Sequence, residues 1–241
     1  MKIKRHIPNI ISLLNALCGA IATYYALRYE AIAIAIYFML GSAVLDFFDG
    51  FAARKLQAFS PLGKDIDSLS DVISFGVAPA AMMSIALAQI GFHIPGIAFI
   101  IVPASVYRLA KFNHDTRQTK SFIGLPTPAN ALFFAGLAYW TVEMAEQIKH
   151  LPIMIEYKVY PMYVVVLLLM SYLLISEVPM FSLKGVESDS PSAQRGHKIS
   201  VVIVLLVGII SISLWWLTGF ALAILAYLLI NLFNYFRHRI P

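Results

Sequence analysis

The chain has 241 residues, of which 60% are hydrophobic and only 13% are charged, and its formal net charge is +5 at pH 7. About a quarter of the residues in a soluble domain are charged, so the composition excludes an ordinary soluble protein. Apolar runs of about 20 residues, the length that crosses a bilayer as a helix, recur along the chain. We therefore expect one all-α domain over residues 1–241, a polytopic helical bundle in a membrane.

Eight membrane-spanning helices are expected, although six or seven remain possible because the boundaries of the later apolar runs are weak. The expected spans are 7–27, 31–56, 61–90, 94–112, 126–145, 159–178, 199–217 and 219–236. Residues 182–198 are rich in serine, glycine and charges, which predicts a flexible cytoplasmic loop.

Positive charge orients this arrangement. With eight spans, most lysines and arginines fall on the side that also holds both termini, and the positive-inside rule makes that side cytoplasmic. We therefore expect a multi-pass protein of the cell (inner) membrane. The same bias accounts for the net positive charge, so no nucleic-acid partner is expected. Cys18 is the only cysteine, which excludes an intrachain disulfide.

Carboxylates are concentrated in "LDFFDGFAARKLQAFSPLGKDIDSLSDVISFG", residues 45–76. Asp46 and Asp49 share one helical stripe, and Asp67 and Asp71 share a second. Ser60-Pro61 is typical of a helix start, so two antiparallel helices with a short turn are predicted. Their register sets Asp46 opposite Asp71 and Asp49 opposite Asp67, a four-carboxylate cluster near the cytoplasmic interface. Asp65 lies off both stripes and is expected to face solvent.

Such a cluster needs positive partners, because burying an unpaired charge costs several kcal/mol. Carboxylates without histidine or cysteine favour hard cations such as Mg²⁺, Mn²⁺ or Ca²⁺, and two such ions bridging a diphosphate would form a phosphoryl-transfer site. Gly50, Gly63 and Ala53 would leave room for a ligand, and Arg54 offers a forked phosphate donor. Close helix packing is an alternative explanation of the small residues.

Together these residues form the pattern D-x2-D-G-x2-A-R-x8-G-x3-D-x3-D, which resembles the CDP-alcohol phosphotransferase family. The resemblance implies the fold of that family and an integral membrane enzyme, usually a homodimer, that transfers a substituted phosphate from a CDP-linked donor to an alcohol and releases CMP. It also implies that Asp46, Asp49, Asp67 and Asp71 bind two divalent cations, Mg²⁺ or Mn²⁺. By the same resemblance Asp71 is the general base, and Gly50, Ala53, Arg54 and Gly63 contact the cytidine diphosphate.

The acceptor alcohol is indicated by flanking segments. Residues 8–19, 67–80, 107–113 and 122–131 resemble the membrane-spanning phosphatidylserine synthases of this family, which implies CDP-diacylglycerol as donor and L-serine as acceptor. Glycerol 3-phosphate or an inositol phosphate would be an alternative acceptor for the same chemistry. A divalent-cation transporter is a more distant alternative, for which charges would be spread along several spans.

Two further polar groups are candidates for substrate contacts. Arg108, Lys111 and Asn113 would bind the acceptor carboxylate or a lipid phosphate, or else only anchor the topology. Asn9 and Ser12, with Asn15 on the same strip of the first span, would line the nucleotide pocket, although hydrogen bonding between helices explains them nearly as well.

Overall fold

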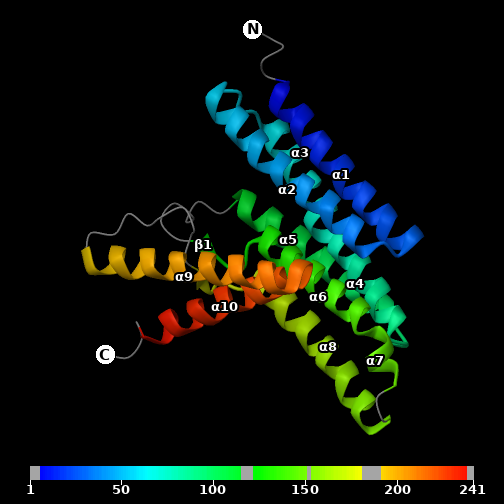
Figure 1. Cartoon of the computed structure of the whole chain (residues 1–241). Helices are drawn as coiled ribbons and strands as arrows, with labels where there is room; N and C mark the ends of the chain where they lie inside the picture. Colours follow the sequence, from blue (N-terminus) through cyan, green and yellow to red (C-terminus); the bar gives the residue numbers. More distant parts are fainter. Residues whose placement is uncertain (1–5, 115–121, 151–152, 181–190, 238–241) are drawn as a thin grey trace.

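The computed structural model describes residues 6–114, 122–150, 153–180 and 191–237, and within them the protein is helical apart from one very short ladder. That ladder pairs β1 (Phe122–Ile123) with β2 (Pro179–Met180) in antiparallel fashion. The expected all-α membrane bundle is confirmed. Figure 1 shows the arrangement of the helices.

Every expected span corresponds to a helix or to a continuous series of helices. The first two are α1 (Ile7–Tyr29) and α2 (Ile32–Lys55). The third combines α3 (Pro61–Asp71), the π-helix η2 (Val72–Val77) and α4 (Ala78–Gln89), and the fourth combines the 3₁₀-helix η3 (Pro95–Ile100) with α5 (Ile101–His114). The others are α6 (Thr127–Glu143), α8 (Ile153–Ile175), α9 (Pro191–Trp215) and α10 (Gly219–Arg237), with a short α7 (Ala145–Lys149) after α6 and η4 (Trp216–Thr218) before α10.

Five helical stretches among the described residues are long and apolar enough to cross a membrane. They are Ile7–Tyr29, Ile32–Lys55, Pro61–Gln89, Pro95–His114 and Lys198–Phe233. The last stretch is folded at η4 into α9 and α10, which pack against each other. The fifth and sixth expected spans correspond to shorter helices, α6 with 17 residues and the apolar stretch Val159–Ile175.

The prediction of a flexible loop at 182–198 is wrong for residues 191–198. Helix α9 begins at Pro191, so residues 191–198 are helical, whereas 181–190 lie outside the described residues. Proline fits the first position of a helix because its φ angle is already helical and its missing N–H is not needed there. Ala193, Gln194 and Arg195 are then good helix formers.

The arrangement of the first three helical segments sets up the site. Helix α1 packs along α2 and also along α3 and η2, and α1 and α2 run antiparallel, as Figure 1 shows. Helix α4 lies at the centre, where Ala80, Ala81 and Met82 are fully buried and pack towards α6. Helix α1 thus contacts both α2 and α3. The candidate site lies between these two helices.

The turn between α2 and α3 begins the third segment as predicted. Ser60 is the N-cap of α3, and its Oγ accepts a hydrogen bond from the backbone N–H of Gly63 at 3.0 Å. Pro61 occupies the first turn. This cap, a common way to satisfy a free N–H at a helix start, fixes where α3 begins and therefore the register of its aspartates against α2.

Candidate metal and nucleotide site

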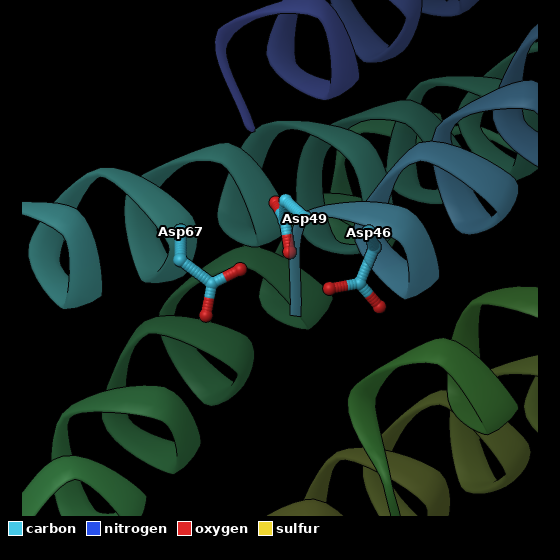
Figure 2. A group of neighbouring side chains, drawn as sticks. All are labelled: Asp46, Asp49 and Asp67. Carbon is cyan, nitrogen blue, oxygen red and sulfur yellow. The ribbon is translucent and has the colours of Figure 1, made fainter. Parts of the chain in front are cut away.

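Three carboxylates from two helices converge at this face. Asp46 and Asp49 lie one turn apart on α2, and Asp67 projects from α3, so that one oxygen of each lies within 4.8 Å of the other two. Figure 2 shows the three side chains turned towards a common space. The group contains only carboxylates, which are ligands that Mg²⁺, Mn²⁺ and Ca²⁺ prefer.

The environment of these carboxylates fits a bound cation. Asp49 is 4% exposed and accepts a hydrogen bond from Ser12 Oγ on α1 at 2.6 Å. Asp67 Oδ1 is buried and has no hydrogen-bond partner among the described residues. A buried acceptor without a partner is costly, and a metal ion is one way to satisfy it. These residues therefore fit a divalent cation.

Asp71 lies one turn further along α3, outside the close group of three. It is 8% exposed, and its Oδ1 accepts a hydrogen bond from Asn15 Nδ2 at 3.2 Å. A negative charge on Asp71 would be repelled by the negative charges of Asp46, Asp67 and Asp49. The structure thus gathers Asp46, Asp49 and Asp67 closely and sets Asp71 beside them, held by a partner from α1.

A cavity of about 640 Å³ adjoins the carboxylates. Its lining includes six of the seven residues that the sequence assigned to nucleotide binding, Asn15 being the exception, together with two of the aspartates: Asn9, Ser12, Gly50, Ala53, Arg54, Gly63, Asp49 and Asp67. Ligand cavities of a few hundred Å³ are typical of small-molecule sites. Gly50, Ala53, Arg54 and Gly63 of the sequence pattern therefore line the same cavity, next to the group of carboxylates.

Sequence reasoning did not single out every residue of this lining. Lys64 and Phe59 also line the cavity, as do Pro8, Ala58, Ser60 and Pro61. The position of Lys64 beside Gly63, in the first turn of α3, was a signal that could have found it. Its ammonium donates to the backbone oxygen of Asn113 on α5, a residue that does not line this cavity.

The two glycines of the pattern serve different purposes. A Cβ at Gly63 would lie 2.9 Å from Asn9 Oδ1 and 3.0 Å from Ser60 Oγ, so a side chain here would displace the ends of these two side chains. A Cβ at Gly50 would meet only the guanidinium of Arg54, with Nη1 at 3.5 Å. Gly63 thus permits close packing, whereas Gly50 keeps space open towards the cavity.

The predicted acceptor residues lie on α5, away from the lining of this cavity. Arg108 is 5% exposed, and its Nε donates to the backbone oxygen of Leu125 at 3.4 Å. Lys111 Nζ lies 2.9 Å from Glu177 Oε1 in a salt bridge.

Asn113 connects α5 to α3. Its Nδ2 donates to Ser68 Oγ at 2.7 Å, and its backbone oxygen accepts from Lys64 Nζ at 2.5 Å. Arg108, Lys111 and Asn113 are therefore each engaged with a different neighbour.

A membrane helical bundle that sets a carboxylate group beside a cavity with arginine and lysine is suited to bind a metal-bound phosphate compound. The family model described as CDP-alcohol phosphatidyltransferase matches residues 5–157. This match covers more than half of the chain, and the chain therefore belongs to the CDP-alcohol phosphatidyltransferase family.

Several curated proteins resemble the chain over about half of its length. A CDP-diacylglycerol–serine O-phosphatidyltransferase of Bacillus subtilis (strain 168) is 39% identical over 133 residues, which is 55% of this chain and 72% of that protein. A protein of the same name from Saccharomyces cerevisiae is 32% identical over 149 residues, 56% of this chain and 54% of that protein. An archaetidylserine synthase of Methanothermobacter thermautotrophicus is 37% identical over 128 residues, 52% of this chain and 54% of that protein. The chain thus spans only about half the length of the last two.

Proposed function

We propose that the protein transfers the phosphatidyl group of CDP-diacylglycerol to the hydroxyl of L-serine, giving phosphatidylserine and CMP. The observation that carries this proposal is the group of Asp46, Asp49 and Asp67 beside the cavity that Gly50, Arg54 and Gly63 line. Family membership supports the reaction class, and the names of the Bacillus and Saccharomyces relatives support serine as the acceptor.

The cavity is the proposed site of the cytidine diphosphate. Gly50 and Ala53 carry small or absent side chains where the nucleotide approaches the backbone of α2. Gly63 contributes by letting Asn9 and Ser60 pack beside it in the wall of the cavity. The guanidinium of Arg54 offers planar, bidentate contacts to phosphate. The diacylglycerol part of the donor would stay in the bilayer, next to the exposed apolar side chains of Phe59 and Leu62, which are 74% and 64% exposed.

The carboxylates are the proposed ligands of two divalent cations, Mg²⁺ or Mn²⁺, held by Asp46, Asp49, Asp67 and Asp71. Bound there, the cations would offset charge on the diphosphate and on the departing CMP. The unpartnered oxygen of Asp67 supports this part of the proposal, because a cation would satisfy it.

Asp71 is the proposed general base, since it is the acidic residue that lies deepest in α3 and just outside the close group. The serine hydroxyl oxygen forms a bond to the phosphatidyl phosphorus. The bond between that phosphorus and the bridging oxygen of the diphosphate breaks, and CMP departs with the electron pair. The hydroxyl proton passes to an oxygen of Asp71, and later to solvent.

The acceptor contact is assigned to Arg108. Its side chain is buried in α5, and a guanidinium is the usual partner of a carboxylate such as that of serine. Lys111 and Asn113, which bond Glu177 and α3, would instead hold the end of α5 in place.

We also propose that the protein lies in the inner membrane, with the site and both termini on the cytoplasmic side. Arg54, Lys55, Lys64 and Lys111 gather at one end of the bundle, where Lys64 on α3 contacts Asn113 at the end of α5. At the opposite end Glu30 accepts from Gln89 Nε2 at 2.8 Å. Excess positive charge favours the cytoplasmic side.

The proposal also treats the chain as one domain that forms a homodimer, as the sequence resemblance implies. The mass of the protein in detergent, measured by light scattering, tests the dimer.

The experiment is CMP release by the detergent-purified full chain given CDP-diacylglycerol and either Mg²⁺ or Mn²⁺. L-serine, glycerol 3-phosphate, inositol and inositol phosphate are tested singly as acceptors. Release that depends on serine and is abolished by EDTA is the expected result. Release with another acceptor would overturn serine as the substrate but keep the mechanism. Folded, metal-binding protein that releases no CMP would contradict the enzyme and favour cation transport.

A further inference from the structure

Asn15 on α1 is hydrogen-bonded both to Asp71, the proposed general base, and to the π-helix η2 that follows Asp71 in the chain. Its side chain is fully buried in the middle of α1, and its Nδ2 donates to Asp71 Oδ1 at 3.2 Å. Neither Asn15 nor Asp71 is among the described residues that line the cavity, so the hydrogen bond between them lies outside that lining.

The other end of this amide is also held. Ser74 Oγ on η2 donates to Asn15 Oδ1 at 2.7 Å and lies 3.0 Å from the backbone oxygen of Asn15. A hydroxyl donor at Oδ1 fixes the amide so that its NH₂ faces Asp71. With the amide reversed, Oδ1 would oppose the carboxylate and its acceptors would repel each other.

Close approach of α1 and η2 makes this arrangement possible. A Cβ at Gly19 would lie 2.6 Å from Ser74 Cα, so only glycine lets the two helices meet at this level. The π-helix η2 begins directly after Asp71, and π segments within α-helices are often found at functional sites.

We infer that Asn15 is a positioning residue for Asp71, with Ser74 fixing the orientation of the Asn15 amide. This inference rests on the proposed function, in which Asp71 receives the proton of the acceptor. A carboxylate held at Oδ1 presents its other oxygen in a set direction. Misplacing a reacting group by about 1 Å can lower a rate about 100-fold, so loss of the holder should lower turnover more than substrate binding.

The structure supplies a matched control for this inference. Ser42 on α2 is also fully buried and also donates to the backbone oxygen of Asn15, at 3.1 Å. Unlike Ser74, Ser42 does not hydrogen-bond the side-chain amide of Asn15; its second acceptor is the backbone oxygen of Phe38 at 3.3 Å. Ser42→Ala and Ser74→Ala therefore remove the same group near the same residue, but only the second releases the amide.

The test measures kcat for CMP release, and KM for CDP-diacylglycerol, with the full chain in detergent. We expect Ser74→Ala to lower kcat about 10-fold and Asn15→Ser to lower it about 100-fold, with KM within about threefold of wild type. Ser42→Ala should keep kcat within about twofold. Melting temperatures establish that each variant is folded. If Ser74→Ala does not fold, Asn15→Ser is the variant that tests the inference.

Equal losses of kcat in Ser42→Ala and Ser74→Ala would overturn the inference, because they would mean that only packing matters. Wild-type kcat in Asn15→Ser would overturn it as well, and so would a rise in KM without a fall in kcat. An inactive wild-type protein would instead count against the proposed function, so the two failures are distinguishable. If wild type uses another acceptor, the same comparison is made with that acceptor.

Discussion

Ser12 on α1 donates a hydrogen bond from its Oγ to Asp49 Oδ2 on α2 at 2.6 Å, so the first helix of the chain orients a carboxylate of the second. Partners of metal ligands commonly contribute about 10-fold to metal affinity or activity. We expect Ser12→Ala to raise the Mn²⁺ concentration that gives half-maximal CMP release about 10-fold. The measurement is a Mn²⁺ titration of the rate.

Ser105→Ala is the control for this variant. Ser105 is as deeply buried, but its hydroxyl bonds Ile101 of its own helix at 2.8 Å. The Ser105→Ala variant should therefore keep the wild-type dependence of CMP release on Mn²⁺ concentration. An unchanged titration for Ser12→Ala would mean that the Ser12 hydroxyl does not support metal binding.

A side chain at Gly63 should weaken binding of the donor. In Gly63→Ala the new methyl would meet Asn9 Oδ1 at 2.9 Å and Ser60 Oγ at 3.0 Å, which disturbs both the cap of α3 and the wall of the cavity. We expect KM for CDP-diacylglycerol to rise about 10-fold, equivalent to about 1.4 kcal/mol of binding free energy. Gly41→Ala on α2 is the matched control, since its Cβ meets no atom within 4 Å; similar KM values in the two variants would contradict this account.

Arg54 should bind the diphosphate. A hydrogen bond to a charged group contributes about 1.5–3 kcal/mol, so Arg54→Ala should raise KM for CDP-diacylglycerol at least about 10-fold. Lys55→Ala removes the same charge one residue away, where the lysine Nζ lies 5.7 Å from the centre of the Phe51 ring, and it should change KM less than about twofold. Equal effects would show that only the overall positive charge of this end matters.

Arg108 and Lys111 should differ in their effect on the acceptor. Arg108→Lys keeps the charge but loses the planar donor pair, and we expect the half-saturating serine concentration to rise about 10-fold. Lys111→Ala breaks an exposed pair with Glu177, of a kind that contributes about 0–1 kcal/mol, and should leave serine saturation nearly unchanged. Serine dependence that follows Lys111 instead of Arg108 would reassign the acceptor contact.

The parts of the site that lie close together in the sequence were predictable. The spacing of Asp46 and Asp49 before the turn, and of Asp67 after it, was enough to predict that their carboxylates meet, because both helices and the Ser60 cap are defined by local chemistry. Gly50, Ala53, Arg54 and Gly63, which belong to the same two helices, share one cavity for the same reason.

Contacts made by helices that are distant in the sequence were not predictable in the same way. Hydropathy does not say which face of α1 meets α2 and α3, so the polar strip of Ser12 and Asn15 was open to two explanations. The structure has Ser12 in both roles, since it lines the cavity and bonds Asp49. The pairing of Lys111 with Glu177 across 66 residues has no local signal either.

If these aspartates hold the cations that CMP release requires, Asp67→Asn should stop the reaction. This change keeps the size of the side chain but removes the charge beside Asp46 and Asp49. Asp65→Asn, two residues away on the exposed side of α3, is the control. We predict that Asp67→Asn abolishes serine-dependent CMP release at any Mg²⁺ or Mn²⁺ concentration, while Asp65→Asn stays near wild type. Substantial release by folded Asp67→Asn protein would contradict the account.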